Sequence, residues 1–273
     1  IYLDFKVVIV KCFLHLGFMK PNHKLIMKKS YYLIISLVLL SVVNSLFAQQ
    51  TSGIVKYKGA INEEFRKSFI EDFKNKDVAP DIRKGVVEMY LNAQEDTYEL
   101  HFKNQESYFH YMKELENETG KGLKMGSKAG TNEFYVNLTD KKIIEKNSVL
   151  GFLEYSGIQW DVKNVTKNIG DYKCFKAVGT EKNFTRSGAI KEEQVVAWFT
   201  PDIPLQFGPK NYNGMPGLIL QIDKEKFSIL ATQVILNPDE KIEIEAIKKD
   251  EKIRSRREAY QIANEYYKDA YGN

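Results

Sequence analysis

The strongest constraint on the fold is a change in hydrophobic period near residue 97. From Thr97 onward apolar and polar residues alternate, with Tyr98, Leu100 and Phe102 on one side of the chain. Alternation with a period of two is typical of a strand that buries one face. The segment therefore predicts an antiparallel sheet with one face in the core and the other in water.

More strands are expected along the chain, because short apolar runs are separated by turn residues at short intervals. Large aromatic side chains pack well on such a sheet, and the chain has 16 Phe and 16 Tyr. The further predicted strands are Gly53–Lys58, Phe134–Leu138, Lys142–Glu145, Val149–Tyr155, Asp171–Thr180, Glu193–Thr200, Leu218–Asp223, Phe227–Leu236 and Lys241–Ile247.

Helical patterns stand at both ends of this sheet region. Phenylalanine recurs at every fourth position from Phe65 to Phe73, and Asn62 is placed to cap that helix. Asp81 is expected to cap a second helix soon after. At the C-terminal end, Asp250–Tyr271 has apolar residues at helical spacing beneath many charged residues.

These patterns predict a single α+β domain dominated by a curved antiparallel β-sheet. Two helices precede most of the sheet, and an amphipathic helix ends the chain. No internal repeat and no Pro/Ser-rich linker divides the sequence, which favours one domain over two.

The N-terminal region has the pattern of an export signal. Two lysines precede an apolar run, Tyr31–Phe47, and Ala48 stands before a polar junction. This order is typical of a secretory signal peptide, and the run is at the short end of the ~17–25 residues that a membrane-spanning helix needs. We expect a mis-annotated or upstream extension over 1–26, a signal peptide over 27–48 and an exported domain over 49–273.

The net charge of +4 belongs to this N-terminal region. Residues 1–48 carry six lysines and Asp4, a local charge of +5, which leaves −1 for residues 49–273. Nucleic-acid binding needs a concentrated basic face, so nucleic acid is not an expected partner. No apolar stretch after residue 48 approaches membrane-spanning length. We therefore expect a protein of the periplasm or the exterior that is not integral to the membrane after signal cleavage.

No segment has the spacing of a known catalytic or metal site. The histidines after residue 48 are His101 and His110, and neither an H-E-x-x-H pattern nor a Cys/His zinc spacing is present. Cys174 is expected to be a thiol packed in the sheet. We therefore expect no enzyme, no cofactor and no metal. A hydrolase would require a histidine close to Cys174, or a pair of carboxylates.

The segment from residue 198 to 220 is the most distinctive part of the chain. Prolines lack the N–H that a strand ladder needs, and Asn-Gly and Pro-Gly dipeptides favour turns, so the segment predicts a corner that leads into a buried strand. It is either a plain corner or the rim of a pocket. The candidate rim residues are Trp198, Phe199, Phe207, Tyr212 and Met215. The structural residues of the motif are Pro201, Pro204, Gly208, Pro209, Gly214, Pro216, Gly217, Leu218 and Ile219.

At these residues the chain resembles the GLPGLI family, exported proteins of diderm bacteria that are named for one short segment. Here that segment is Gly214–Ile219, with Met215 in place of Leu. The family has no established biochemical function, so the resemblance implies export and a shared fold. The layout is also similar to the half-barrels of periplasmic lipoprotein carriers, which hold acyl chains in an apolar concavity.

Two functions fit these observations. The first is a non-enzymatic binding or carrier module for a hydrophobic ligand, either lipid or peptide, held in a groove between the sheet and the helix at 65–73. The alternative is an accessory protein that docks on an outer-membrane receptor, transporter or secretion system through a sheet edge or the C-terminal helix. The resemblance implies this alternative, because GLPGLI proteins often accompany outer-membrane transporters.

Overall fold

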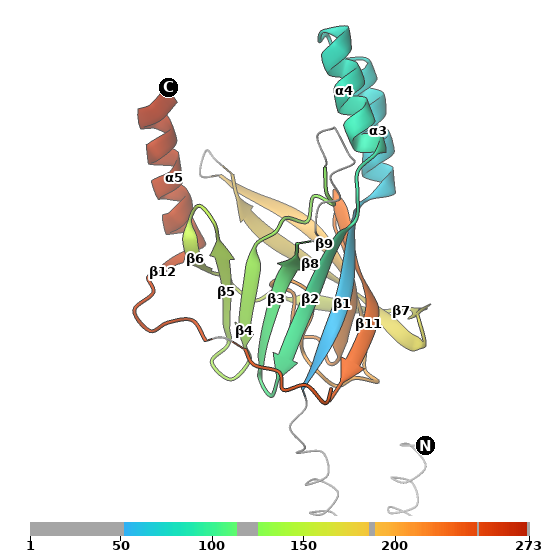
Figure 1. The fold of residues 1–273 in the computed structure, drawn as a ribbon, viewed down its shortest axis with the longest axis vertical. Helices are drawn as coiled ribbons and strands as arrows, with labels where there is room; N and C mark the ends of the chain where they lie inside the picture. Colours follow the sequence, from blue (N-terminus) through green and yellow to red (C-terminus); the bar gives the residue numbers. More distant parts are fainter. Residues whose placement is uncertain (1–51, 114–124, 186–188, 245, 272–273) are drawn as a thin grey trace, which may run out of the picture. The chain divides into compact units, whose positions relative to one another are not determined.

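Most of the described chain forms one large sheet (Figure 1). The computed structural model describes residues 52–113, 125–185, 189–244 and 246–271, so the expected extension and signal peptide lie outside the described residues. The described strands are β1 (Ser52–Ile61), β2 (Asp96–Lys103), β3 (Glu106–Met112), β4 (Glu133–Asn137), β5 (Lys142–Asn147), β6 (Gly151–Glu154), β7 (Trp160–Ile169), β8 (Tyr172–Phe184), β9 (Ile190–Thr200), β10 (Leu218–Asp223), β11 (Phe227–Leu236) and β12 (Ile253–Ser255). The described helices are α3 (Glu63–Lys74), α4 (Pro80–Leu91) and α5 (Arg256–Tyr271).

The sheet is curved and does not close. Its strand order is β12-β6-β5-β4-β3-β2-β1-β11-β10-β9-β8-β7, so β12 and β7 are the two edges. Neighbouring strands are antiparallel except β12, which pairs with β6 in parallel. Strand β1 lies inside the sheet between β2 and β11. This pairing brings the first described strand next to one of the last in the chain. The expected α+β fold with a curved antiparallel sheet is confirmed.

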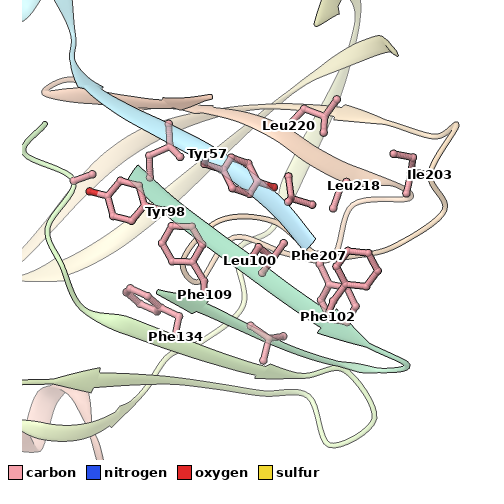
Figure 2. Packing of buried hydrophobic residues seen from close by; sticks show 14 of the residues in the cluster. Tyr57, Tyr98, Leu100, Phe102, Phe109, Phe134, Ile203, Phe207, Leu218 and Leu220 are labelled. Carbon is pink, nitrogen blue, oxygen red and sulfur yellow. The ribbon is translucent and has the colours of Figure 1, made fainter. Parts of the chain in front are cut away.

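One face of the sheet carries the main apolar core (Figure 2). Tyr57, Tyr98 and Leu100 are completely buried on this face, and the ring of Phe109 stacks on Tyr98 with centroids 5.2 Å apart. Phe207, from the segment between β9 and β10, packs over the same face. Burial of each large apolar side chain stabilises the fold by roughly 1.5–3 kcal/mol, so packing on this face stabilises the sheet substantially.

The alternating pattern correctly located most strands, and the predicted bounds of β10 and β11 match the structure. The predicted strand at Lys241–Ile247 is wrong, because its described residues form no strand. Strand β1, which lies beside β11, is already paired on both sides. The segment that follows β11 therefore has no unpaired strand edge nearby with which to form a ladder. It crosses the ends of β2 to β5 instead (Figure 1), with Ile242 buried and its carbonyl accepting a bond from Lys103.

The sequence did not predict β3, β7 or β12. Strand β7 is exposed over most of its length, so it carries no alternation of apolar and polar residues. Strand β12 is too short to show a period. Strand β3 follows β2 through a tight turn in which Asn104 has a φ of 57°, a conformation that Asn adopts more readily than most residues.

The cap of the first helix is as predicted, and the cap of the second is not. The side chain of Asn62 accepts hydrogen bonds from the backbone N–H groups of Glu64 and Phe65. In α4 the capping position is Ala79, and Asp81 lies inside the first turn. Pro80 determines this start, because proline has the φ of a helix and the first turn needs no N–H from it.

Helix α3 packs against α4 and does not cover the sheet as expected. The ring of Phe69 stacks on Tyr90 of α4 with centroids 3.9 Å apart. Their shared apolar cluster also includes Ile61 at the end of β1 and Met125. The aromatic stripe of α3 is therefore buried mainly against its neighbouring helix.

The C-terminal helix begins later than predicted, because β12 occupies residues before it. Arg256 donates hydrogen bonds to the carbonyl of Lys182 and the side chain of Asn183, and Tyr260 stacks on Phe184. These contacts attach α5 to the end of β8. Among the described helices, none is both long and apolar enough to cross a membrane.

Candidate functional site

The five candidate rim residues pack into apolar clusters around the corner between β9 and β10. Phe199, Tyr212 and Met215 lie together in one cluster and are almost fully buried. Phe207 lies in the core of Figure 2, and the half-buried Trp198 packs against that core. The structure thus brings three of the five together. That they form the rim of a pocket stays a prediction.

The corner has the structure that its prolines and glycines predict. Strand β9 ends at Thr200, directly before Pro201. The backbone N–H of Leu218 then donates to the carbonyl of Ile203 at 2.9 Å, and that of Ile219 donates to Phe207 at 2.9 Å. These bonds hold the loop against the first residues of β10.

Two glycines of the corner are required by their surroundings. A Cβ atom on Gly217 would lie 2.1 Å from the carbonyl oxygen of Thr200, which is backbone and cannot move aside cheaply. Gly214 has a φ of 84°, a conformation that side chains disfavour. The motif therefore specifies a tight backbone approach, independently of any ligand.

A buried ionic cluster includes Tyr212 of the corner. The ammonium of Lys224 donates to Oε2 of Glu181 at 2.6 Å and lies 2.9 Å from Oε2 of Glu193. The hydroxyl of Tyr212 also donates to Glu181. Burial acts to raise the pKa of Glu181, but the charge and hydrogen bond of Lys224, together with the charges of Lys210 and Arg256, outweigh it and hold the pKa below its ordinary value.

Lys210, also in the corner, is partly buried, and no carboxylate of the described residues forms an ion pair with it. Its ammonium donates to the carbonyl of Ala129 at 2.6 Å and lies over the rings of Phe134 and Phe227. Burial lowers the pKa of Lys210 to about 8, against the opposing effect of Glu181. The side chain can therefore change charge near neutral pH.

A groove of about 490 Å³ lies between the sheet and the segment that follows β11. Strands β3, β4 and β5 contribute one wall, including Val136 and Ile144, and residues 246–249 with Ile253 contribute the other. Apolar atoms make up the larger part of the lining. The candidate rim residues do not line this groove, and the sequence did not predict it, because its second wall was expected to be a strand.

Next to the groove, the partly exposed face of β3 and β4 carries a polar network. Tyr108 and Tyr135 both donate to Oε2 of Glu133, at 2.9 Å and 3.2 Å. Lys146 also donates to this carboxylate, at 3.0 Å. Burial acts to raise the pKa of Glu133, but the bonds from Lys146 and the tyrosines lower it further than burial raises it.

The same face brings together the two histidines of the described chain. In the β2–β3 hairpin, Glu99 pairs directly with His110, and His101 follows on the same face. The rings of His101 and His110 are 5.2 Å apart between centroids. Burial lowers the pKa of His110, and the neighbouring His101 lowers it further. The sequence signal that could have predicted this pair was the turn at Asn104, which folds β3 back onto β2.

Cys174 is fully buried, as expected, and its thiol lies close to the carbonyl of Tyr172. Burial raises the pKa of Cys174 to about 11, although Lys167 acts in the opposite direction. A thiol with this pKa is protonated at neutral pH and is a poor nucleophile.

A protein-family model matches residues 181–221, and its description is "Protein of unknown function (Porph_ging)". The matched stretch runs from the end of β8 through β9 and the corner into β10, and it contains Gly214–Ile219. The description assigns no activity. No curated protein matches the chain.

Two solved structures are similar to the chain, and both are described as PNGF-II. One, in space group C2, has 13% identity and a TM-score of 0.40 over 78% of this chain and 33% of its own. The other, in space group P21, has 14% identity and a TM-score of 0.38 over 76% of this chain and 31% of its own. The chain thus spans about a third of the length of either protein. Similarity at this level carries no conclusion about activity.

Proposed function

We propose that the protein is a non-enzymatic binding module for a small hydrophobic ligand with a polar end, and that the ligand occupies the groove between β3–β5 and residues 246–253. The groove itself is the observation that carries the proposal. Its volume of about 490 Å³ falls within the range of roughly 300–1,000 Å³ that is typical of small-molecule sites.

The lining supports a ligand of mixed character. Val136, Ile144 and Ile247 offer an apolar wall for the body of the ligand. Charged groups of both signs lie around this wall, so a positively or a negatively charged end of the ligand could pair with a group of opposite charge. These charged groups are Glu106, Asp140, Lys142, Lys248, Lys249 and Glu251.

Two further observations support binding without catalysis. The protonated thiol of Cys174 lacks the thiolate character of a nucleophile. The resemblance of Gly214–Ile219 to the GLPGLI segment favours an exported protein, and the curved, open sheet is similar in layout to the half-barrels of lipoprotein carriers. The proposed location is therefore the periplasm or the cell exterior, with no membrane-integral part after signal cleavage.

A fluorescent fatty acid tests the proposal. We expect a dansyl-labelled fatty acid to bind saturably and Ala246→Trp to weaken binding by at least about tenfold, because the indole would fill the groove. Val149→Trp is the matched control, since Val149 is 86% exposed and does not line the groove. Absence of saturable binding, or equal affinity in the Ala246→Trp variant, would contradict the proposed site.

The accessory role remains a second proposal, and it rests on strand β7. Among the described strands, β7 is a sheet edge that pairs with β8 alone, and Val162 and Val165 on it are each 49% exposed. An exposed edge can accept a strand from a partner. A photocrosslinker at Val165 in intact cell envelopes should capture one specific outer-membrane protein, and a diffuse or empty crosslinking pattern would argue against this role.

A further inference from the structure

Three potential metal ligands converge on the partly exposed face of the β2–β3 hairpin. Antiparallel pairing sets Glu99 opposite His110, and the strand period returns His101 to the same face two residues later. One ligand atom from each of the three side chains can be chosen so that all lie within 4.8 Å of one another. The tertiary pairing of two strands therefore assembles a compact donor set.

The donor set is of a kind that binds first-row transition metals. It offers two imidazole nitrogens and one carboxylate oxygen, and imidazole suits Zn²⁺, Cu²⁺, Fe²⁺ and Ni²⁺. In a tetrahedral zinc site with bonds of about 2.0–2.1 Å, neighbouring ligand atoms lie roughly 3.4 Å apart. Nε2 of His101 is 2.9 Å from Oε2 of Glu99, and a ligand atom of His110 lies within 4.8 Å of a ligand atom on each of the other two residues.

An independent observation concerns the imidazole of His110. Its Nδ1 atom is buried, and the described structure provides it with no hydrogen-bond partner. A buried polar atom without a partner costs about 1–3 kcal/mol, so proteins rarely leave one unsatisfied. Coordination of a cation would satisfy it.

The surroundings of the cluster are compatible with a cation. The ring of His110 stacks on Tyr108 at a centroid distance of 4.7 Å, which holds the imidazole in place. Nζ of Lys56 lies 3.9 Å from Oε1 of Glu99, whereas Oε2 of Glu99 faces His101 and lies 2.9 Å from its Nε2. Glu133 adds a negative charge that acts on His110 and is itself paired with Lys146.

We propose that Glu99, His101 and His110 form a binding site for a divalent transition-metal cation such as Zn²⁺. Three protein ligands leave one position of a tetrahedral ion for water or for a ligand atom. The site is separate from the groove, although Tyr135 lines the groove and bonds to the same Glu133 carboxylate as Tyr108.

Zn²⁺ binding to the full chain, purified without a polyhistidine tag, tests the site. Isothermal titration calorimetry should detect one Zn²⁺ per chain, and His101→Ala and His110→Ala should each weaken binding on the order of 100-fold or more. Glu192→Gln, which changes an exposed carboxylate of β9 outside the cluster, is the matched control and should bind as the unmodified chain does. Co²⁺ should give the visible absorption of a tetrahedral site.

The outcomes separate a real site from an adventitious one. An affinity weaker than about 100 µM in the unmodified chain would overturn the proposal, as would unchanged binding in both single variants. Loss of binding in the Glu192→Gln variant would also overturn it, because the metal would then depend on groups outside the cluster. Should an alanine variant fail to fold, Glu99→Gln decides the question: it keeps the shape of the side chain and should still weaken Zn²⁺ binding.

Discussion

At the scale of single residues, the corner between β9 and β10 shows why its sequence is distinctive. Gly217 lies against the backbone of Thr200, and Gly214 adopts a conformation that favours glycine. Steric requirements of this kind act between backbone atoms, so they constrain residue type more strictly than apolar packing does. A distinctive segment can therefore report a tight turn without any ligand being involved.

Gly217→Ala should destabilise the protein by at least about 2 kcal/mol, because its Cβ would approach the Thr200 carbonyl to 2.1 Å. Gly85→Ala is the control. Gly85 lies on the exposed side of α4 with no atom near an added Cβ, so that variant should be stabilised by ~0.5–1 kcal/mol. Urea unfolding measures both, and a Gly217→Ala variant as stable as the unmodified protein would disprove the steric explanation.

At the scale of elements, buried ion pairs connect two strands to the turn between β10 and β11. Lys224 lies in the turn between β10 and β11 and reaches Glu181 of β8 and Glu193 of β9. The side chains of Lys224 and Glu181 are each only 9% exposed, so solvent screens this pair weakly. Removing one partner would leave an uncompensated charge, which costs more than the pair contributes.

Lys224→Met should therefore destabilise the protein by about 3–5 kcal/mol near neutral pH. The double variant Lys224→Met/Glu181→Gln should recover part of that loss, because it also removes the stranded carboxylate. Thermal and urea unfolding of the two variants would establish the order of stabilities. If the double variant were the less stable of the two, the loss would not come from the unpaired charge of Glu181.

At the scale of the whole molecule, the partly buried Lys210 predicts how stability depends on pH. Its pKa is about 8 in the folded protein and 10.5 as an ordinary lysine. Between these pH values the unfolded chain binds more protons at Lys210 than the folded protein does. The free energy of unfolding therefore rises with pH from about 8 to about 10.5 because of this residue. Below pH 8 Lys210 is protonated in both the folded and the unfolded state, so the folded state then bears the full free-energy cost of burying its charge.

Lys210→Met should remove this pH dependence. The free energy of unfolding of the unmodified protein, minus that of the variant, should increase by about 3 kcal/mol as the pH rises through this window. Taking the difference cancels the effect of buried tyrosines such as Tyr57, whose raised pKa acts in the opposite direction at high pH. Urea unfolding at several pH values measures it, and a difference that stays constant would contradict the lowered pKa.

The sequence alone determined the local features of this protein. It predicted the strands that alternate, the cap of α3 at Asn62, and a corner that ends β9 at Pro201, because these depend on residues a few positions apart. It also predicted the fold class, since alternation over many segments leaves an antiparallel sheet as the way to bury one face of each.

Only the tertiary structure decided which segments meet. It paired β1 with β11, left Lys241–Ile247 without a strand partner, and so opened the groove beside β3 to β5. It also folded β3 onto β2, which placed His110 beside Glu99 and His101. Alternation defines the face of a strand but not its neighbour, because pairing depends on competition among all strands for free edges.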